Sequence, residues 1–110
     1  MSNVSKHVVA FLNDHVDHVV KLELLLAVHA APSATTTIPT AARLLDVSRS
    51  QVRAMADELE EKGVLRVTSD RIELAPASID VRLAVSDLAS IYHRDREGVL
   101  DVLRSLGRVS

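Results

Sequence analysis

The sequence predicts a mainly helical domain that carries one small β-hairpin. Three observations in its middle stretch indicate this fold class. Ser48 precedes Gln51 by three residues, the spacing of a capping box, in which both side chains satisfy free backbone donors at a helix start. Apolar residues then recur at helical spacing until Gly63, a residue that commonly ends a helix in the left-handed conformation. Two short stretches with a two-residue apolar period follow, separated by Ser69-Asp70 as a turn.

The first helix is expected over residues 4–12. Apolar residues at positions 4, 8, 9, 11 and 12 form one broad face, and the helix is expected to start near Ser2 or Asn3. The polar run Asn13-Asp14-His15 is expected to break or bend it.

A second helix is expected to begin with Asp17 as its N-cap. Its apolar residues surround most of the circumference, which is typical of a central buried helix. Pro32 should end this helix by Ala31, and residues 31–36 are expected to form an irregular loop rich in Pro, Ser and Thr.

The next helix is expected to be short, with Thr37 as its cap and Pro39 in its first turn, where no backbone N–H is needed. Small Ala42 would let this helix cross the following one closely. The inward-facing residues of the pair are predicted to be Ala41, Ala42 and Leu45 on the first helix and Val52, Met55, Ala56 and Leu59 on the second. Asp46-Val47-Ser48 forms the turn between them. The order helix, turn, helix, hairpin is a winged helix-turn-helix plan.

The spacing AxxLxVSxxxV…L…KGVL, from Ala42 to Leu65, resembles the winged helix-turn-helix superfamily of bacterial transcription regulators, with an architecture like that of the MarR and ArsR types. The resemblance implies a mainly α fold with a small β-hairpin wing and flanking helices. It divides the single domain 1–110 into N-terminal helices (1–31), the helix-turn-helix plus wing (37–76) and a C-terminal helical segment (77–110). It also implies a regulator that binds double-stranded DNA.

In such a fold the second helix of the turn motif lies in the major groove and its first residues reach base edges. Arginine can hold guanine O6 and N7 with two parallel hydrogen bonds, whereas contacts to phosphates set position without reading sequence. The expected DNA-contacting residues are Arg43, Ser48, Arg49, Ser50, Gln51, Arg53, Arg66 and Arg71. The alternative is an ordinary solvated face, with Arg53 and Asp57 as an ion pair along the helix.

The charge balance leaves a second function open. The net charge is −2, and residues 37–75 hold six cations against seven anions, whereas DNA-binding domains are usually basic. DNA binding must therefore depend on where the cations lie. The alternative function is a winged-helix module that binds a protein of the transcription machinery or a regulatory partner through its flanking helices.

The C-terminal segment carries a heptad-like apolar stripe. The polar run 93–97 favours a kink or break, so that two helices are expected in place of one. The stripe, together with the N-terminal helix, is interpreted as a homodimer interface; the alternative is a helix folded back on its own core. The expected interface residues are Val81, Val85, Leu88, Tyr92, Val99, Val102 and Leu106.

Composition excludes several classes of protein. Phe11 and Tyr92 are the only aromatic residues, so a base-stacking surface for single strands is not expected. The chain has no cysteine, and its apolar runs are too short to span a bilayer. The first residues, MSNVSKH, do not follow the plan of a signal peptide, and a cytoplasmic location is expected.

Catalytic and metal-binding motifs are absent from the sequence. No Gly-rich phosphate loop, HExxH motif or nucleophile elbow occurs, so no enzyme activity and no cofactor are expected. His15 and His18 with Asp17 are the best candidates for metal ligands, but no third ligand is placed by sequence and no metal site is expected. A ligand- or metal-responsive repressor, with a pocket between dimer helices, is the third and weakest functional hypothesis.

Overall fold

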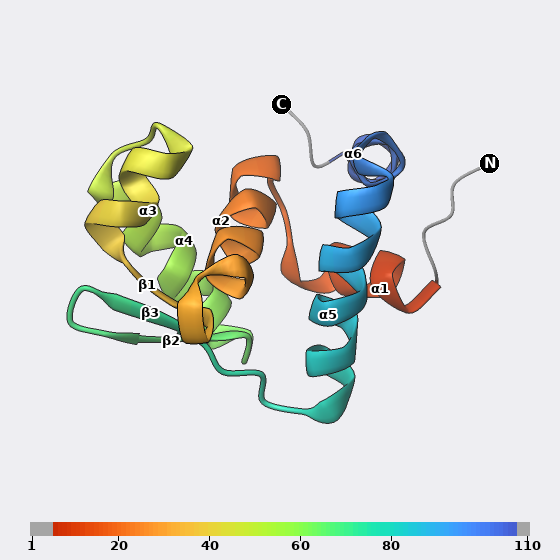
Figure 1. Ribbon diagram of the computed structural model, residues 1–110. Helices are drawn as coiled ribbons and strands as arrows, with labels where there is room; N and C mark the ends of the chain where they lie inside the picture. The colour runs from red at the N-terminus through yellow and green to blue at the C-terminus, as the bar shows by residue number, and fades with distance from the viewer. Residues whose placement is uncertain (1–5, 108–110) are drawn as a thin grey trace.

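The computed structural model describes residues 6–107. It is mainly helical, with one small three-stranded antiparallel sheet (Figure 1). Helix α2 stands in the middle, with α3, α4 and the sheet on one side and α1, α5 and α6 on the other. The elements are α1 (Lys6–His15), α2 (Val19–Ala30), the short 3₁₀ helix η1 (Pro32–Ala34), β1 (Thr35–Thr37), α3 (Ile38–Leu45), α4 (Arg49–Glu61), β2 (Leu65–Thr68), β3 (Arg71–Leu74), α5 (Ile79–Arg94) and α6 (Arg96–Ser105).

The junction between α1 and α2 differs from the prediction. Helix α1 continues through Asn13 and Asp14 to His15, so the expected break at these residues is wrong; its expected start near Ser2 or Asn3 lies outside the described residues. The N-cap of α2 is His18, whose Nδ1 accepts a hydrogen bond from the Val20 N–H at 3.1 Å. Asp17 is not the cap, because its carboxylate reaches Lys21 one turn further along.

The stretch after α2 is also more ordered than predicted. Only Pro32–Ala34 is irregular, with Ser33 and Ala34 at positive φ. Thr35–Thr37 forms β1, which pairs antiparallel with β3 so that Thr36 lies opposite Ile72 and the sheet order is β1-β3-β2. The sequence did not predict this strand because its three threonines become a strand only against a partner more than thirty residues away.

The α3–turn–α4 unit follows the prediction. The Thr37 hydroxyl oxygen accepts from the Thr40 N–H at 3.3 Å and caps α3. Asp46 takes the left-handed conformation (φ 56°), and the Val47 N–H donates to the Ala42 carbonyl at 3.1 Å. Ala41 and Ala42 are buried, and Val47 packs against the core at the crossing of the two helices.

Gly63 connects α4 to the hairpin. Its φ of +78° turns the chain out of the helix, and the Val64 N–H donates back to the Leu59 carbonyl at 2.9 Å. Strands β2 and β3 then pair with Val67 opposite Ile72, and Ser69 supplies the positive φ of the turn. The predicted hairpin and its turn are therefore confirmed.

The C-terminal segment consists of two helices, as the polar run predicted, and the break falls at Asp95. The expected dimer stripe, however, is the inner face of these helices. Val85, Leu88 and Val99 are fully buried within the single chain, and the other members pack partly buried against the same core: Val81, Tyr92, Val102 and Leu106. These three fully buried side chains have no surface that a second chain could contact. Their assignment to a dimer interface is therefore wrong. For these residues the alternative, a segment folded on its own core, is correct.

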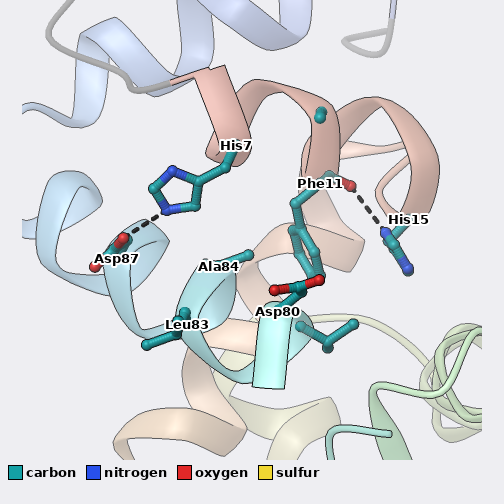
Figure 2. Close-up of a pocket in the computed structure, with 9 residues that line it drawn as sticks. His7, Phe11, His15, Asp80, Leu83, Ala84 and Asp87 are labelled. Carbon is teal, nitrogen blue, oxygen red and sulfur yellow. Dashed lines mark hydrogen bonds and ion pairs between the residues drawn. The ribbon is translucent and has the colours of Figure 1, made fainter. Parts of the chain in front are cut away.

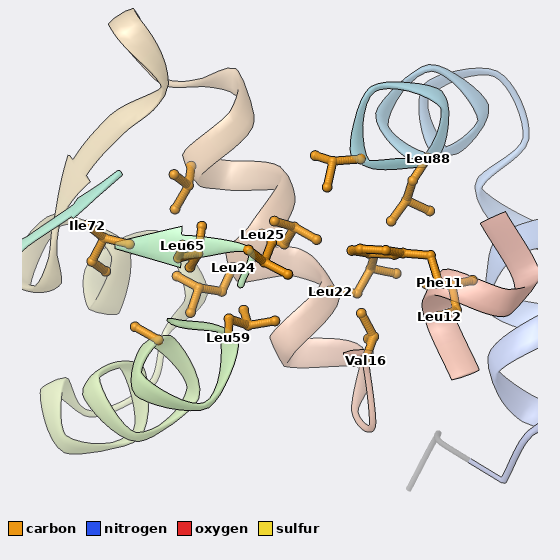
Figure 3. Packing of buried hydrophobic residues seen from close by; sticks show 14 of the residues in the cluster. Phe11, Leu12, Val16, Leu22, Leu24, Leu25, Leu59, Leu65, Ile72 and Leu88 are labelled. Carbon is orange, nitrogen blue, oxygen red and sulfur yellow. The ribbon is translucent and has the colours of Figure 1, made fainter. Parts of the chain in front are cut away.

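One apolar core joins the two sides of the molecule (Figure 3). Leu24 and Leu25 of α2 lie toward Leu65 and Ile72 of the sheet, while Leu22 lies toward Leu12, Phe11 and Leu88. This double packing explains why α2 is apolar around most of its circumference. No helix within residues 6–107 combines the length and the apolar character that a membrane crossing requires.

Candidate nucleic-acid interface

The amino end of α4 is exposed and holds four of the eight expected contact residues close to one another. Arg49, Ser50, Gln51 and Arg53 are all exposed. The capping box fixes the first turn: the Ser48 hydroxyl oxygen accepts from the Gln51 N–H at 3.1 Å, and Gln51 Oε1 accepts from the Ser48 N–H at 3.0 Å. The Ser48 hydroxyl oxygen and the Gln51 amide oxygen are therefore already used inside the protein, so their role as contact residues is limited to their remaining donors.

The Arg53 side chain is bound to the turn of the hairpin. Its Nη2 donates to the Ser69 carbonyl at 2.8 Å and to Asp70 Oδ1 at 3.2 Å. The pair of Arg53 with Asp57, which belonged to the alternative of a solvated face, does not form; Arg53 contacts the hairpin turn. This contact ties the middle of α4 to the loop between β2 and β3.

A shallow hollow of about 160 Å³ lies where α3, α4 and this turn meet. Arg49, Ser50 and Arg53 line it from α4, and Asp70 lines it from the hairpin, next to the start of α3. The Ile38 N–H donates to the Asp70 carbonyl at 2.7 Å, which holds the start of α3 against the same turn. The hollow is therefore polar and carries charges of both signs.

The remaining arginines divide into two groups. Arg66 pairs with Glu73 across the two strands at 3.0 Å, so its charge is balanced locally. Arg43, Arg49 and Arg71 are exposed and form no ion pair with any residue in the described part of the chain. These three residues come from α3, α4 and β3, and Arg49 alone of them lines the hollow.

The acidic residues of α4 lie at its other end and have structural roles. Glu58 accepts from the buried Lys21 ammonium of α2 at 3.2 Å, and Lys21 also pairs with Asp17 at 2.7 Å. Glu60 Oε2 accepts from the Val67 N–H at 2.8 Å and so holds β2 against the helix. Along α4 itself, the arginines therefore lie toward the amino end and the carboxylates toward the carboxyl end.

The histidines near α2 are engaged in other contacts. His15 stacks on Phe11 with ring centroids 4.6 Å apart, and its Nδ1 lies 3.2 Å from the Phe11 carbonyl oxygen. His18 caps α2. Between residues 6 and 107, no group of three or more His, Asp or Glu side chains is arranged to hold a metal ion.

Sequence reasoning missed the residues that hold the site in place: Lys21, Glu60, Asp70 and the strand β1. Only Lys21 leaves a signal in the sequence, because it is the one Lys or Arg in a mostly apolar helix. The others act through partners seven to seventeen or more positions away, which no local pattern shows.

Comparison with known proteins adds no assignment. No family model matches the chain, and neither a curated protein nor a solved structure matches it at a significant level.

Proposed function

We propose that this protein is a DNA-binding transcription regulator, in which α3 and α4 form the helix-turn-helix and the β2–β3 hairpin forms the wing. The single observation that carries the proposal is the exposed amino end of α4, where Arg49 has no ion-pair partner among the described residues and Ser50 lies beside it. A helix that enters the major groove contacts bases with these first residues. Arg49 would read a base edge, while Arg43 and Arg71 would contact phosphates on either side.

The Arg53–Asp70 pair is compatible with this role. Both side chains are largely exposed, and exposed ion pairs contribute about 0–1 kcal/mol, so a phosphate could replace the carboxylate at small cost. In the absence of DNA the pair holds the turn of the wing against α4. We assign Arg53 to positioning the wing and Arg49 to sequence reading.

The test uses the full chain and a duplex selected from a random-sequence pool by retention on the protein. Arg49→Ala should weaken binding of that duplex about 5- to 100-fold, the value of a bidentate arginine–guanine contact. Arg49→Lys should bind the duplex little better than Arg49→Ala, because an ammonium group cannot make the bidentate contact. Fluorescence anisotropy measures the affinity, and the circular dichroism of each variant should match that of the parent.

Arg82→Ala is the matched control, since Arg82 is an exposed arginine on α5, away from the proposed interface, and should leave affinity unchanged. The dependence of affinity on salt concentration is an independent test of phosphate contacts. With the two phosphate contacts of Arg43 and Arg71, affinity should fall about 12-fold between roughly 50 and 200 mM salt. A pool that yields no enriched duplex, or an affinity that does not respond to salt, would contradict the proposal.

A second function is favoured by specific observations. Arg53 and Arg66 are both balanced by carboxylates, and Leu44 on α3 is 68% exposed beside Arg43. An apolar side chain at this place suits a protein partner better than a phosphate backbone. If the salt and Arg49 tests fail while Leu44→Ser abolishes capture of a transcription component, α3 and α4 form a protein-binding surface instead.

A further inference from the structure

A larger hollow lies between α1 and α5, on the side of α2 away from α4 (Figures 1 and 2). It encloses about 480 Å³, within the range of roughly 300–1,000 Å³ that small-molecule sites occupy. Its walls are mainly apolar, with Ala10 and Phe11 on α1 and Val81, Leu83 and Ala84 on α5. Two of these lining residues are alanines, whose small side chains leave space between the helices.

The polar side chains of this hollow are carboxylates and histidines. Asp80 and Asp87 lie two helical turns apart on one face of α5, so one stands at each end of the hollow. Asp87 Oδ2 lies 2.5 Å from Nε2 of His7 on α1 (Figure 2). Asp80 makes no hydrogen bond or ion pair with any residue between 6 and 107, and neither Lys nor Arg lines the hollow. An apolar site with an unpaired carboxylate at one end complements a ligand that has an apolar body and a positive head.

Ala10 and Leu83 supply the exposed apolar walls, whereas the Phe11 ring is nearly buried, at 4% exposure. It lies between the two helices in Figure 2, and the His15 ring stacks on it with an interplanar angle of 14°. A flat ring system can lie against the exposed walls and bury a large apolar area there.

We propose that the α1–α5 hollow binds a small aryl amine, whose ring packs against the exposed side chains of Ala10 and Leu83 and whose ammonium group donates to Asp80. This site is separate from the proposed DNA interface and does not depend on it. It belongs to a single chain, in contrast to a pocket formed between two copies.

A second copy of the chain fits the hollow less well. Leu83 is 53% exposed and could enter the hollow of a neighbouring chain if two α5 helices packed antiparallel. Residues equally far from the two-fold axis would then face each other. Asp80 and Asp87 lie at equal distances on either side of Leu83 and Ala84, so each Asp80 would oppose Asp87 of the other chain. Like charges opposed in an apolar interface are strongly unfavourable.

The test compares three probes that share one ring and differ in charge: naphthylmethylamine, naphthylmethanol and naphthoate. Each is titrated into the full ¹⁵N-labelled chain and followed by amide chemical shifts. The amine should bind most tightly and naphthoate least, with shifts concentrated on α1 and α5. Asp80→Asn should weaken amine binding about fivefold, and leave naphthylmethanol binding unchanged, since it removes one exposed charge contact.

Two further variants locate the site. Ala10→Leu fills the hollow from an exposed helix position and should abolish binding of all three probes while circular dichroism stays unchanged. Asp57→Asn, on α4, removes a carboxylate outside the hollow and should have no effect on amine binding.

Other results would overturn the proposal. These are equal affinity for the three probes, the absence of any binding, or unchanged binding in Ala10→Leu. A sedimentation mass of two chains that Leu83→Ser reduces to one would also overturn it, because a second copy would then occupy the hollow.

Discussion

The buried ammonium group of Lys21 shows how single residues position the candidate interface. Its side chain is only 6% exposed, yet both of its carboxylate partners, Asp17 and Glu58, are more than half exposed. Water therefore screens part of the attraction, and the pairs contribute less than fully buried ones would. The pair with Glu58 nevertheless joins α2 to α4.

The first prediction concerns the volume and the charge of Lys21 separately. Lys21→Met keeps most of the volume without the charge and should change the free energy of unfolding by less than about 1 kcal/mol, since a well-packed apolar residue often replaces a buried charge without loss. Lys21→Ala also empties the site and should cost about 2–3 kcal/mol. Urea unfolding measures both variants. The exposed Lys62→Met is the control, and equal losses in both Lys21 variants would show that the charge, and not the packing, stabilises the junction.

The connection from α4 to the hairpin depends on one glycine. Gly63 has a φ of +78°, and a Cβ atom built on it would lie 2.9 Å from the Cβ of Ala77. The Ala77 N–H also donates to the Gly63 carbonyl at 2.8 Å, so the segment before α5 passes directly against this turn. Backbone conformation and close approach therefore both require glycine here.

Gly63→Ala should consequently lower the free energy of unfolding by about 2–3 kcal/mol, from the left-handed conformation together with the contact to Ala77. The double variant Gly63→Ala with Ala77→Gly should recover the part due to the contact, which thermal or urea unfolding of all four chains measures as a coupling energy. Gly107→Ala provides a control with a similar φ of +72° and no neighbouring atom within 4 Å. If the losses of the two single variants simply add in the double variant, the contact between positions 63 and 77 contributes nothing to the loss in Gly63→Ala.

The whole molecule is organised by α2, which both sides share. Its residues reach the sheet and α4 in one direction and α1 and α5 in the other, so the candidate interface and the α1–α5 hollow belong to one continuous core. The C-terminal helices complete this core. Self-association remains a prediction. Any dimer interface must consist of residues other than Val85, Leu88 and Val99.

Two leucines on α5 test this arrangement. Leu88 is fully buried, so Leu88→Ala should lower the free energy of unfolding by about 3 kcal/mol with no change in the number of chains per particle. Leu83→Ala, on the exposed side of the same helix, should cost less than about 1 kcal/mol. Urea unfolding and analytical ultracentrifugation separate the two effects. A stable Leu88 variant with a halved mass would restore the original dimer interpretation.

The sequence by itself determined the features that depend on neighbouring residues. The capping box at Ser48, the cap at Thr37, the turn at Gly63 and the hairpin turn at Ser69 were all predicted, because their hydrogen bonds and φ values involve positions within a few residues of one another. The exposure of Arg49 and Ser50 followed from helical periodicity for the same reason.

Only the tertiary structure decided the features that join distant parts of the chain. The strand β1, the pairing of Arg53 with Asp70, the burial of Lys21 and the inward direction of the Leu88 stripe all depend on which elements meet and at what angle. An apolar stripe has the same pattern whether it covers its own core or another chain. The packing of α5 against α1 and α2 supplies the missing information, because it shows which surface the chain itself covers.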